Sequence, residues 1–170
     1  MIDLETVLTY LTLISVPIGV FYHIMTLNNT RKNQQMQLET RQAQLFMGVF
    51  NQLQSQELQN AYNFSRDIIT SENIKEYYDP KHPDYATNRI HFTRLSLFFE
   101  GLGTLVREDL VPIRLVALMI QGLVRPWWEK ARDFTYEQRA NGYESAGSEL
   151  EHLYLSMMKY IEENPDFYHN

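Results

Sequence analysis

The chain has 170 residues, 44% of them hydrophobic and 21% charged, which is enough for one folded domain with an additional segment and excludes general disorder. Its 21 acidic and 15 basic residues leave a net charge of −6, which argues against nucleic-acid binding through phosphate contacts. The absence of cysteine excludes disulfides, thiol nucleophiles and cysteine-ligated metal sites.

The first element is an apolar run, VLTYLTLISVPIGVFYHIMTL, over residues 7–27. About twenty helical residues span a hydrocarbon core of roughly 30 Å. The preceding residues 1–6, MIDLET, are acidic, and the residues after the run are large and polar, unlike a cleaved signal peptide. The run therefore predicts a retained single-pass transmembrane helix after a short tail. The alternative is a buried core helix of a soluble protein.

The flanking charges predict an orientation for this helix. Acidic residues precede it and basic residues follow it, namely Asp3 and Glu5 before, and Arg31, Lys32 and Arg41 after. By the positive-inside tendency, the amino terminus lies outside a plasma or inner membrane and the rest of the chain is cytoplasmic. Ser15 and Gly19 share one helix face with a small-xxx-small spacing, which would contact another membrane helix. The predicted partners are the lipid bilayer and another membrane protein or a second copy.

Residues 28–54 are rich in glutamine, a good helix former, and predict a helical juxtamembrane stalk. An amphipathic stripe appears near its end, formed by Leu45, Phe46, Val49, Phe50 and Leu53. We expect this stripe to pack on the protein's own domain. A self-associating coiled coil would need a longer repeat.

Residues 55–163 predict a cytoplasmic bundle of about four to five helices. Capping and turn residues mark the boundaries: Ser55 before a helix at 57–70, a loop at 71–88, Asn88 before a helix at 89–108, Pro112 opening a helix at 112–139 with a kink at Pro126, Gly142 in the next connection, and a last helix at 149–162. Residues 164–170 read as a mobile tail. No segment alternates as a strand does, so the predicted fold is all-α.

The stretch FFEGLGTLVREDL, residues 98–110, places Glu100, Gly101 and Gly103 in an otherwise apolar helix. Each glycine costs about 1 kcal/mol relative to alanine, which predicts that another backbone approaches closely there. A carboxylate beside such a crossing loses water and needs a partner. We therefore expect an ion pair from Glu100 to Arg132 or, as a second choice, Arg125 on the next helix.

A functional reading of Glu100 competes with this structural one. A desolvated carboxylate has a raised pKa and can act as a general acid or base, as in a hydrolytic enzyme. Such a site would need a second group, and Glu129 is the nearby candidate. The structural pair is the favoured interpretation.

Other motifs do not predict a metal, cofactor or catalytic residue. Glu149 and His152 form one Glu-x-x-His spacing, but the second copy that di-iron bundles use is missing. The GLG of residues 101–103 follows no strand, and neither Ser96 nor Ser145 lies in a nucleophile elbow. Of the adjacent tryptophans 127 and 128, one should be core and the other half-exposed.

The combination of FFEGLGTLVREDLVP, an apolar helix and PWWEKARDFTYEQR resembles a family of small bacterial and archaeal proteins known only as a domain of unknown function. The likeness covers about residues 7–140, and RQAQLFMGVFNQL at 41–53 resembles the family's juxtamembrane helix. The matching positions are Phe98, Phe99, Glu100, Gly103, Val106, Trp128, Glu129 and Arg139. The resemblance implies a membrane anchor and a helical domain, and it implies no activity.

We therefore expect a non-catalytic accessory, scaffold or interaction subunit of a membrane-associated complex. One alternative is a membrane-tethered sensor that binds a small ligand between its helices near Glu100 and the tryptophans. The other is a hydrolytic enzyme that uses Glu100.

Overall fold

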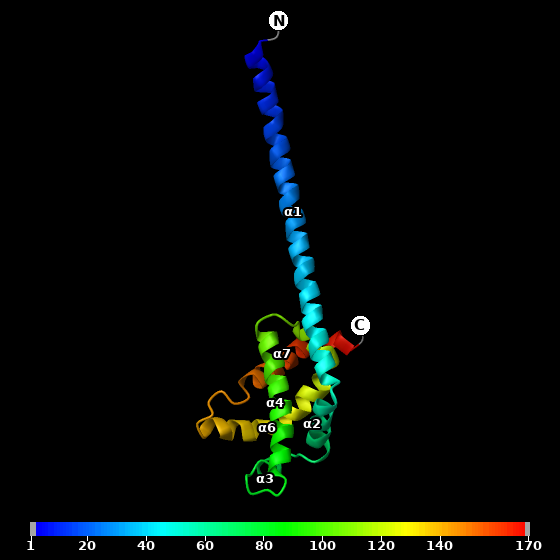
Figure 1. Ribbon diagram of the computed structural model, residues 1–170, viewed down its shortest axis with the longest axis vertical. Coiled ribbons are helices and arrows are strands. Elements are labelled where there is room, and N and C mark those ends of the chain that lie inside the picture. Colours follow the sequence, from blue (N-terminus) through cyan, green and yellow to red (C-terminus); the bar gives the residue numbers. More distant parts are fainter. Residues whose placement is uncertain (1–2, 169–170) are drawn as a thin grey trace. The chain divides into compact units, whose positions relative to one another are not determined.

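The computed structural model describes the backbone of residues 3–168 and the side chains of Asp3, Leu13 and residues 15–167. This part of the chain is all helical, as predicted, and contains no strand (Figure 1). The elements are α1 Leu4–Leu53, α2 Gln56–Asp67, α3 Ile74–Tyr77, α4 Tyr85–Arg107, α5 Ile113–Met119, α6 Gln121–Ala140, α7 Ser148–Glu163 and the 3₁₀ helix η1 Pro165–Tyr168.

The chain divides into two compact units, Met1–Arg41 and Gln42–Asn170, with the boundary inside α1. The second unit therefore begins within the predicted stalk and not at Ser55. It includes the last turns of α1, where Phe46 and Val49 are buried in the hydrophobic core of that unit. The stripe at the end of the stalk thus packs on the chain's own helices.

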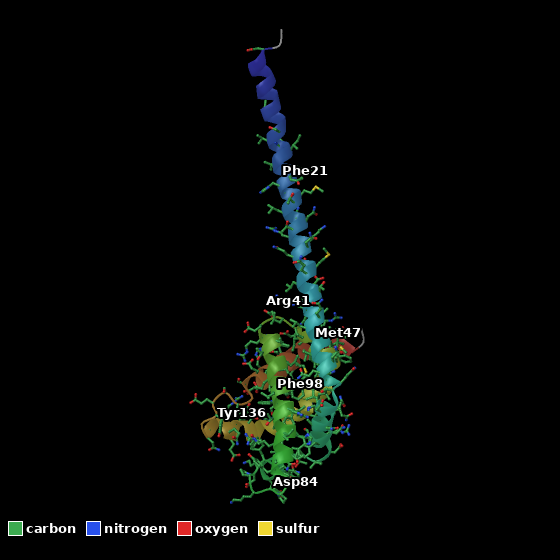
Figure 2. All side chains as sticks on the ribbon, in the orientation of Figure 1. Phe21, Arg41, Met47, Asp84, Phe98 and Tyr136 are labelled. Carbon is green, nitrogen blue, oxygen red and sulfur yellow. The ribbon has the colours of Figure 1, made fainter. Side chains whose placement is uncertain are left out.

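The first unit consists of α1 residues whose side chains, where described, are exposed on every side of the helix. Leu13 is 63% exposed and Phe21 70%, and Figure 2 shows Phe21 standing away from the helix. In the part of the chain with described side chains, no helix is both long enough and apolar enough to cross a membrane. The side chains of residues 7–12 and Ile14, in the predicted span, lie outside that part.

The second unit is a helical bundle in which α4 and α7 pack on each other at the centre. Apolar residues at spacings of three and four form one buried stripe along α4, namely Phe92, Leu95, Phe99, Leu102 and Val106. Leu153 and Met157 of α7 are fully buried in the same core. The burial of this stripe, rather than helix propensity, holds α4 in place.

One predicted helix boundary is confirmed and two others differ. Ser55 caps α2, where its hydroxyl accepts from Leu58 N at 3.3 Å. Asn88 is no cap: it is buried inside α4 and donates from Nδ2 to Tyr77 O at 3.3 Å, which ties α3 to α4. The predicted helix 112–139 breaks at Ile120 and not at Pro126, which lies inside α6.

The tail predicted at 164–170 contains a short helix, and its residues 169 and 170 lie outside the described part of the chain. Residues 165–168 form η1, and the ring of Phe167 packs edge-on against Tyr160 with centroids 5.6 Å apart. This aromatic contact fixes the turn after α7 against the last turns of that helix.

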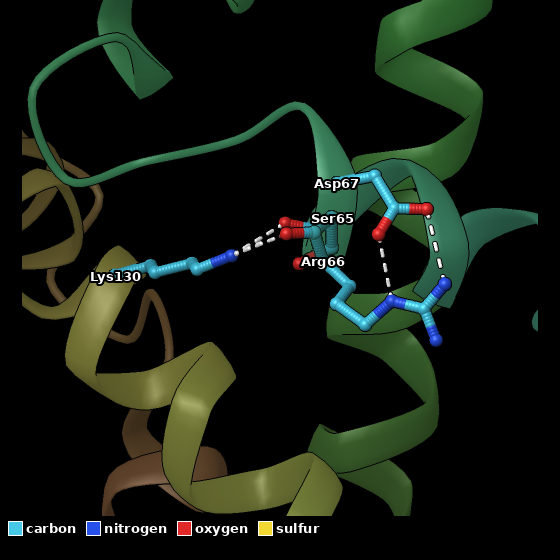
Figure 3. A network of polar contacts seen from close by, with 4 residues as sticks. All are labelled: Ser65, Arg66, Asp67 and Lys130. Atoms are coloured by element: carbon cyan, nitrogen blue, oxygen red, sulfur yellow. Dashed lines mark hydrogen bonds and ion pairs between the residues drawn. The ribbon is translucent and has the colours of Figure 1, made fainter.

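A lysine from α6 holds the carboxyl-terminal end of α2. Lys130 Nζ donates to Ser65 O at 2.7 Å and to Arg66 O at 3.2 Å (Figure 3). The last carbonyls of a helix have no intrahelical donor and carry the negative end of the helix dipole, so an ammonium group suits them. Burial lowers the pKa of Lys130.

Gly103 lies at a close crossing of α4 with α7, not with the segment 112–139 that the sequence suggested. A Cβ atom built on Gly103 would lie 2.6 Å from the carbonyl carbon and 3.0 Å from the Cβ of Glu149. Gly101 is exposed and would have nothing within 4 Å of its Cβ, so its assignment to the crossing was wrong.

We predict that Gly103→Ala destabilises the second unit by about 1–3 kcal/mol, because backbone atoms of α7 have to move aside. The matched control is Gly101→Ala, which should stabilise the helix by about 0.5–1 kcal/mol, since an exposed helical glycine gains from a methyl group. Thermal unfolding of the full chain, followed by circular dichroism, gives both values. Equal effects of the two substitutions would contradict the close crossing.

Candidate functional site

The second unit contains a cavity of about 680 Å³ between α4, α6, the α6–α7 connection and the start of α7. Sites for small molecules in proteins typically measure about 300–1,000 Å³. One stripe of α4 lines it, because residues three or four apart share a helix face. That stripe comprises Tyr85, Arg89, Phe92, Thr93, Ser96, Leu97 and Glu100.

Aromatic side chains from α4, from α6 and from the residue after α3 form the cavity wall. Tyr78, just after α3, meets Phe92 of α4 with ring centroids 5.4 Å apart and Phe134 of α6 with centroids 5.1 Å apart, both edge-on. Phe92 in turn lies 5.9 Å from Trp127 of α6. These contacts hold the rings in a fixed arrangement, so the wall is formed before any ligand binds.

Glu100 lies at one end of this wall and acts as the cap of α7. Its Oε2 accepts a hydrogen bond from Glu149 N at 3.1 Å. The residue at the usual capping position is Gly147, which has a φ of 63° and no side chain to accept that bond. A carboxylate suits the free N–H groups and the positive dipole end of a helix start. Glu100 of α4 therefore supplies the hydrogen-bond acceptor that the local sequence at the start of α7 lacks.

The surroundings of Glu100 raise its pKa above the usual range. Burial is the main cause, because it disfavours the charged form. The backbone N–H groups of Glu149 and Leu150 oppose the rise, and the Glu149 carboxylate adds to it. The Glu100 carboxyl is thus less readily ionised than in water.

The predicted ion pair between Glu100 and an arginine is wrong. Arg132 pairs with Asp133 at 3.0 Å on the surface, and Arg125 binds Glu129 at 2.8 Å one turn along α6. The desolvated carboxylate is instead satisfied by backbone N–H groups. Side chains that cap a distant helix leave no pairing signal in the sequence.

Arg139, near the end of α6, holds the connection that closes the cavity. Its Nε donates to Ala146 O at 2.7 Å and its Nη1 to Glu151 at 2.6 Å, while Tyr136 donates to the other Glu151 oxygen at 2.6 Å. Sequence reasoning gave Arg139 no role in the fold.

The remaining candidate residues lie apart from the cavity or serve packing. Glu129 is exposed and bound to Arg125, so it does not face Glu100 as a second carboxylate. Both tryptophans, 127 and 128, are only 3% exposed, so the expected half-exposed ring was wrong. Glu149 pairs with Arg107 at 2.8 Å. Within the described residues no three His, Asp or Glu side chains gather as a metal site would require.

We predict that Glu100→Gln changes how stability depends on pH. A carboxyl whose pKa is raised by folding stabilises the folded state below its ordinary value of 4.5, and that contribution is lost as pH rises through the raised value. Gln cannot ionise but keeps an oxygen for Glu149 N. The free energy of unfolding of the wild type should therefore fall relative to that of the variant as pH rises from 4 towards neutrality. Glu129→Gln, at an exposed position, is the control; parallel wild-type and Glu100→Gln curves would contradict the raised pKa.

Comparison with known proteins identifies the family of the chain. No curated protein and no solved structure matches it. Residues 9–157, which include α4, α6 and the start of α7, match the family described as Domain of unknown function (DUF4760). The match spans well over half of the sequence, and the chain therefore belongs to this family of uncharacterised proteins.

Proposed function

We propose that this chain is a non-catalytic, single-pass membrane protein that presents a helical unit to a partner at the membrane. In this proposal, residues 7–27 cross the bilayer, residues 28–41 continue the helix beyond it, and the second unit lies in the cytoplasm. The partner is another membrane protein or a second copy of the chain. The role is that of an accessory or scaffold subunit.

The observation that supports this proposal is the exposed apolar surface of α1. Nine large hydrophobic residues between positions 13 and 27 are each at least 50% exposed: Leu13, Val16, Ile18, Val20, Phe21, Tyr22, Ile24, Met25 and Leu27. A helix that is apolar all round is buried in a core or in a membrane. Exposed apolar patches of this kind in a soluble protein mark a surface that something else covers.

The membrane part of the proposal is tested by topology mapping, for which a chain without cysteine is well suited. Asp3→Cys and Ser71→Cys place single thiols before the proposed span and on the exposed surface of the second unit. A membrane-impermeant maleimide should label the first in intact cells and the second only after lysis. Release of the protein by carbonate, or labelling of both positions in intact cells, would contradict the proposal.

The partner part is tested by native mass spectrometry of the full chain, extracted gently from its own membranes. We expect one defined complex, with a second membrane protein or with copies of the chain. Gly19→Leu should weaken that complex by adding bulk to the small-residue face of Ser15 and Gly19, whereas Val20→Leu, on a different face, should not. A wild-type protein that is purely monomeric would refute this part.

A ligand-binding sensor is the second candidate function, and the cavity beside Glu100 favours it. The aromatic wall is ordered, and the volume suits a small molecule. The two candidates are compatible, since a tethered unit can also bind a ligand.

A further inference from the structure

The cavity wall contains a desolvated carboxylate that no cationic side chain neutralises. Among the ion pairs of the described residues, none includes Glu100. The arginine whose charge acts on it is Arg139, and that guanidinium is bound to Glu151 and to Ala146 O. Glu100 is only partly exposed, so its charged form loses part of its hydration, and a bound cation would offset that loss.

The other charged residue that lines the cavity does not neutralise Glu100. Arg89 is exposed and precedes Glu100 by three turns on α4, about 17 Å along the helix axis at ~1.5 Å per residue. The charge at the Glu100 end of the cavity is therefore that of the carboxylate.

The wall between these two ends suits the body of a cationic organic molecule. The rings of Phe92, Trp127 and Phe134 line the cavity, with Phe92 and Trp127 buried and Phe134 partly exposed. Aromatic rings give apolar contact and attract a positive charge that lies within about 6 Å of the ring centre. Hydroxyl groups of Ser96 and Thr135 on the lining add neutral hydrogen-bonding positions. An aromatic wall with one carboxylate at its end is complementary to an amine with an apolar body.

We propose that this cavity binds a small organic monocation, with its ammonium group hydrogen-bonded to Glu100 and its apolar body against Phe92, Trp127 and Phe134. The inference deepens the ligand-binding candidate and is independent of the membrane anchor. An anionic ligand would be repelled by Glu100. A neutral ligand would remove the carboxylate further from water and bring it no opposite charge, which leaves only its backbone N–H partners to stabilise it.

Three molecules of one shape and different charge test the proposal: 4-phenylbutylamine, 4-phenylbutan-1-ol and 4-phenylbutyrate. Binding is measured by isothermal titration calorimetry at pH 7 on the full chain in lipid nanodiscs. The signal of empty nanodiscs is subtracted, which removes partition into the lipid. We expect saturable one-to-one binding of the amine, at least tenfold tighter than that of the alcohol or the acid.

Variants assign the preference to Glu100. Glu100→Gln keeps the shape and the acceptor for Glu149 N, and should reduce the affinity for the amine to that for the alcohol. Glu129→Gln, an exposed carboxylate outside the cavity, should leave it unchanged. Ser96→Phe fills part of the cavity and should weaken binding of all three molecules.

Two results would contradict the inference, and they have different consequences for the sensor candidate. If the alcohol or the acid binds as tightly as the amine, or if Glu100→Gln keeps the preference, the site takes another class of ligand and the sensor candidate survives. If none of the three binds to the wild type at millimolar concentration, the cavity is no site for such ligands, and the sensor candidate falls with the inference. Neither result bears on the topology of the anchor.

Discussion

The second unit depends on the close approach of α4 and α7 at Gly103. A side chain at that position would occupy the space of the Glu149 backbone, so the crossing exists because glycine has no Cβ atom. The same approach brings Glu100, one turn earlier on α4, within hydrogen-bonding distance of Glu149 N. Packing and capping thus occur at one place, and the cavity lies beside it, because Glu100 also lines the cavity.

Charged side chains in this unit hold the ends of helices other than their own. Glu100 of α4 binds the amino-terminal end of α7, and Lys130 of α6 binds the carboxyl-terminal carbonyls of α2. Each charge has the sign that the helix dipole at that end favours. Because each bond links two helices, it fixes their relative position as well as satisfying a backbone group. To form these bonds, both charged groups lose part of their hydration. This loss raises the pKa of Glu100 and lowers the pKa of Lys130.

The sequence was informative where a local pattern determines the structure. The all-helical fold, the Ser55 cap and the packing of Phe46 and Val49 follow from periodicity and capping, which act over a few residues. The break at Ile120 has no glycine or proline at that position to indicate it, and Asn88 resembles a cap although it lies inside α4 and binds Tyr77 O of α3. The pairing of Glu100 was misassigned for the same reason. A backbone N–H partner exists only once two distant helices have met, and no residue type encodes it.

Both tryptophans of the chain, at positions 127 and 128, lie in the second unit, and both are buried. Trp127 faces Phe92 and the cavity, while Trp128 packs near Tyr136 and Tyr154, with ring centroids 5.9 and 6.0 Å away. The intrinsic indole emission of the protein therefore originates entirely from this unit, whatever surrounds the first forty residues. A tryptophan emission spectrum of the purified intact chain in lipid or detergent reports the state of the helical bundle alone, with no label added.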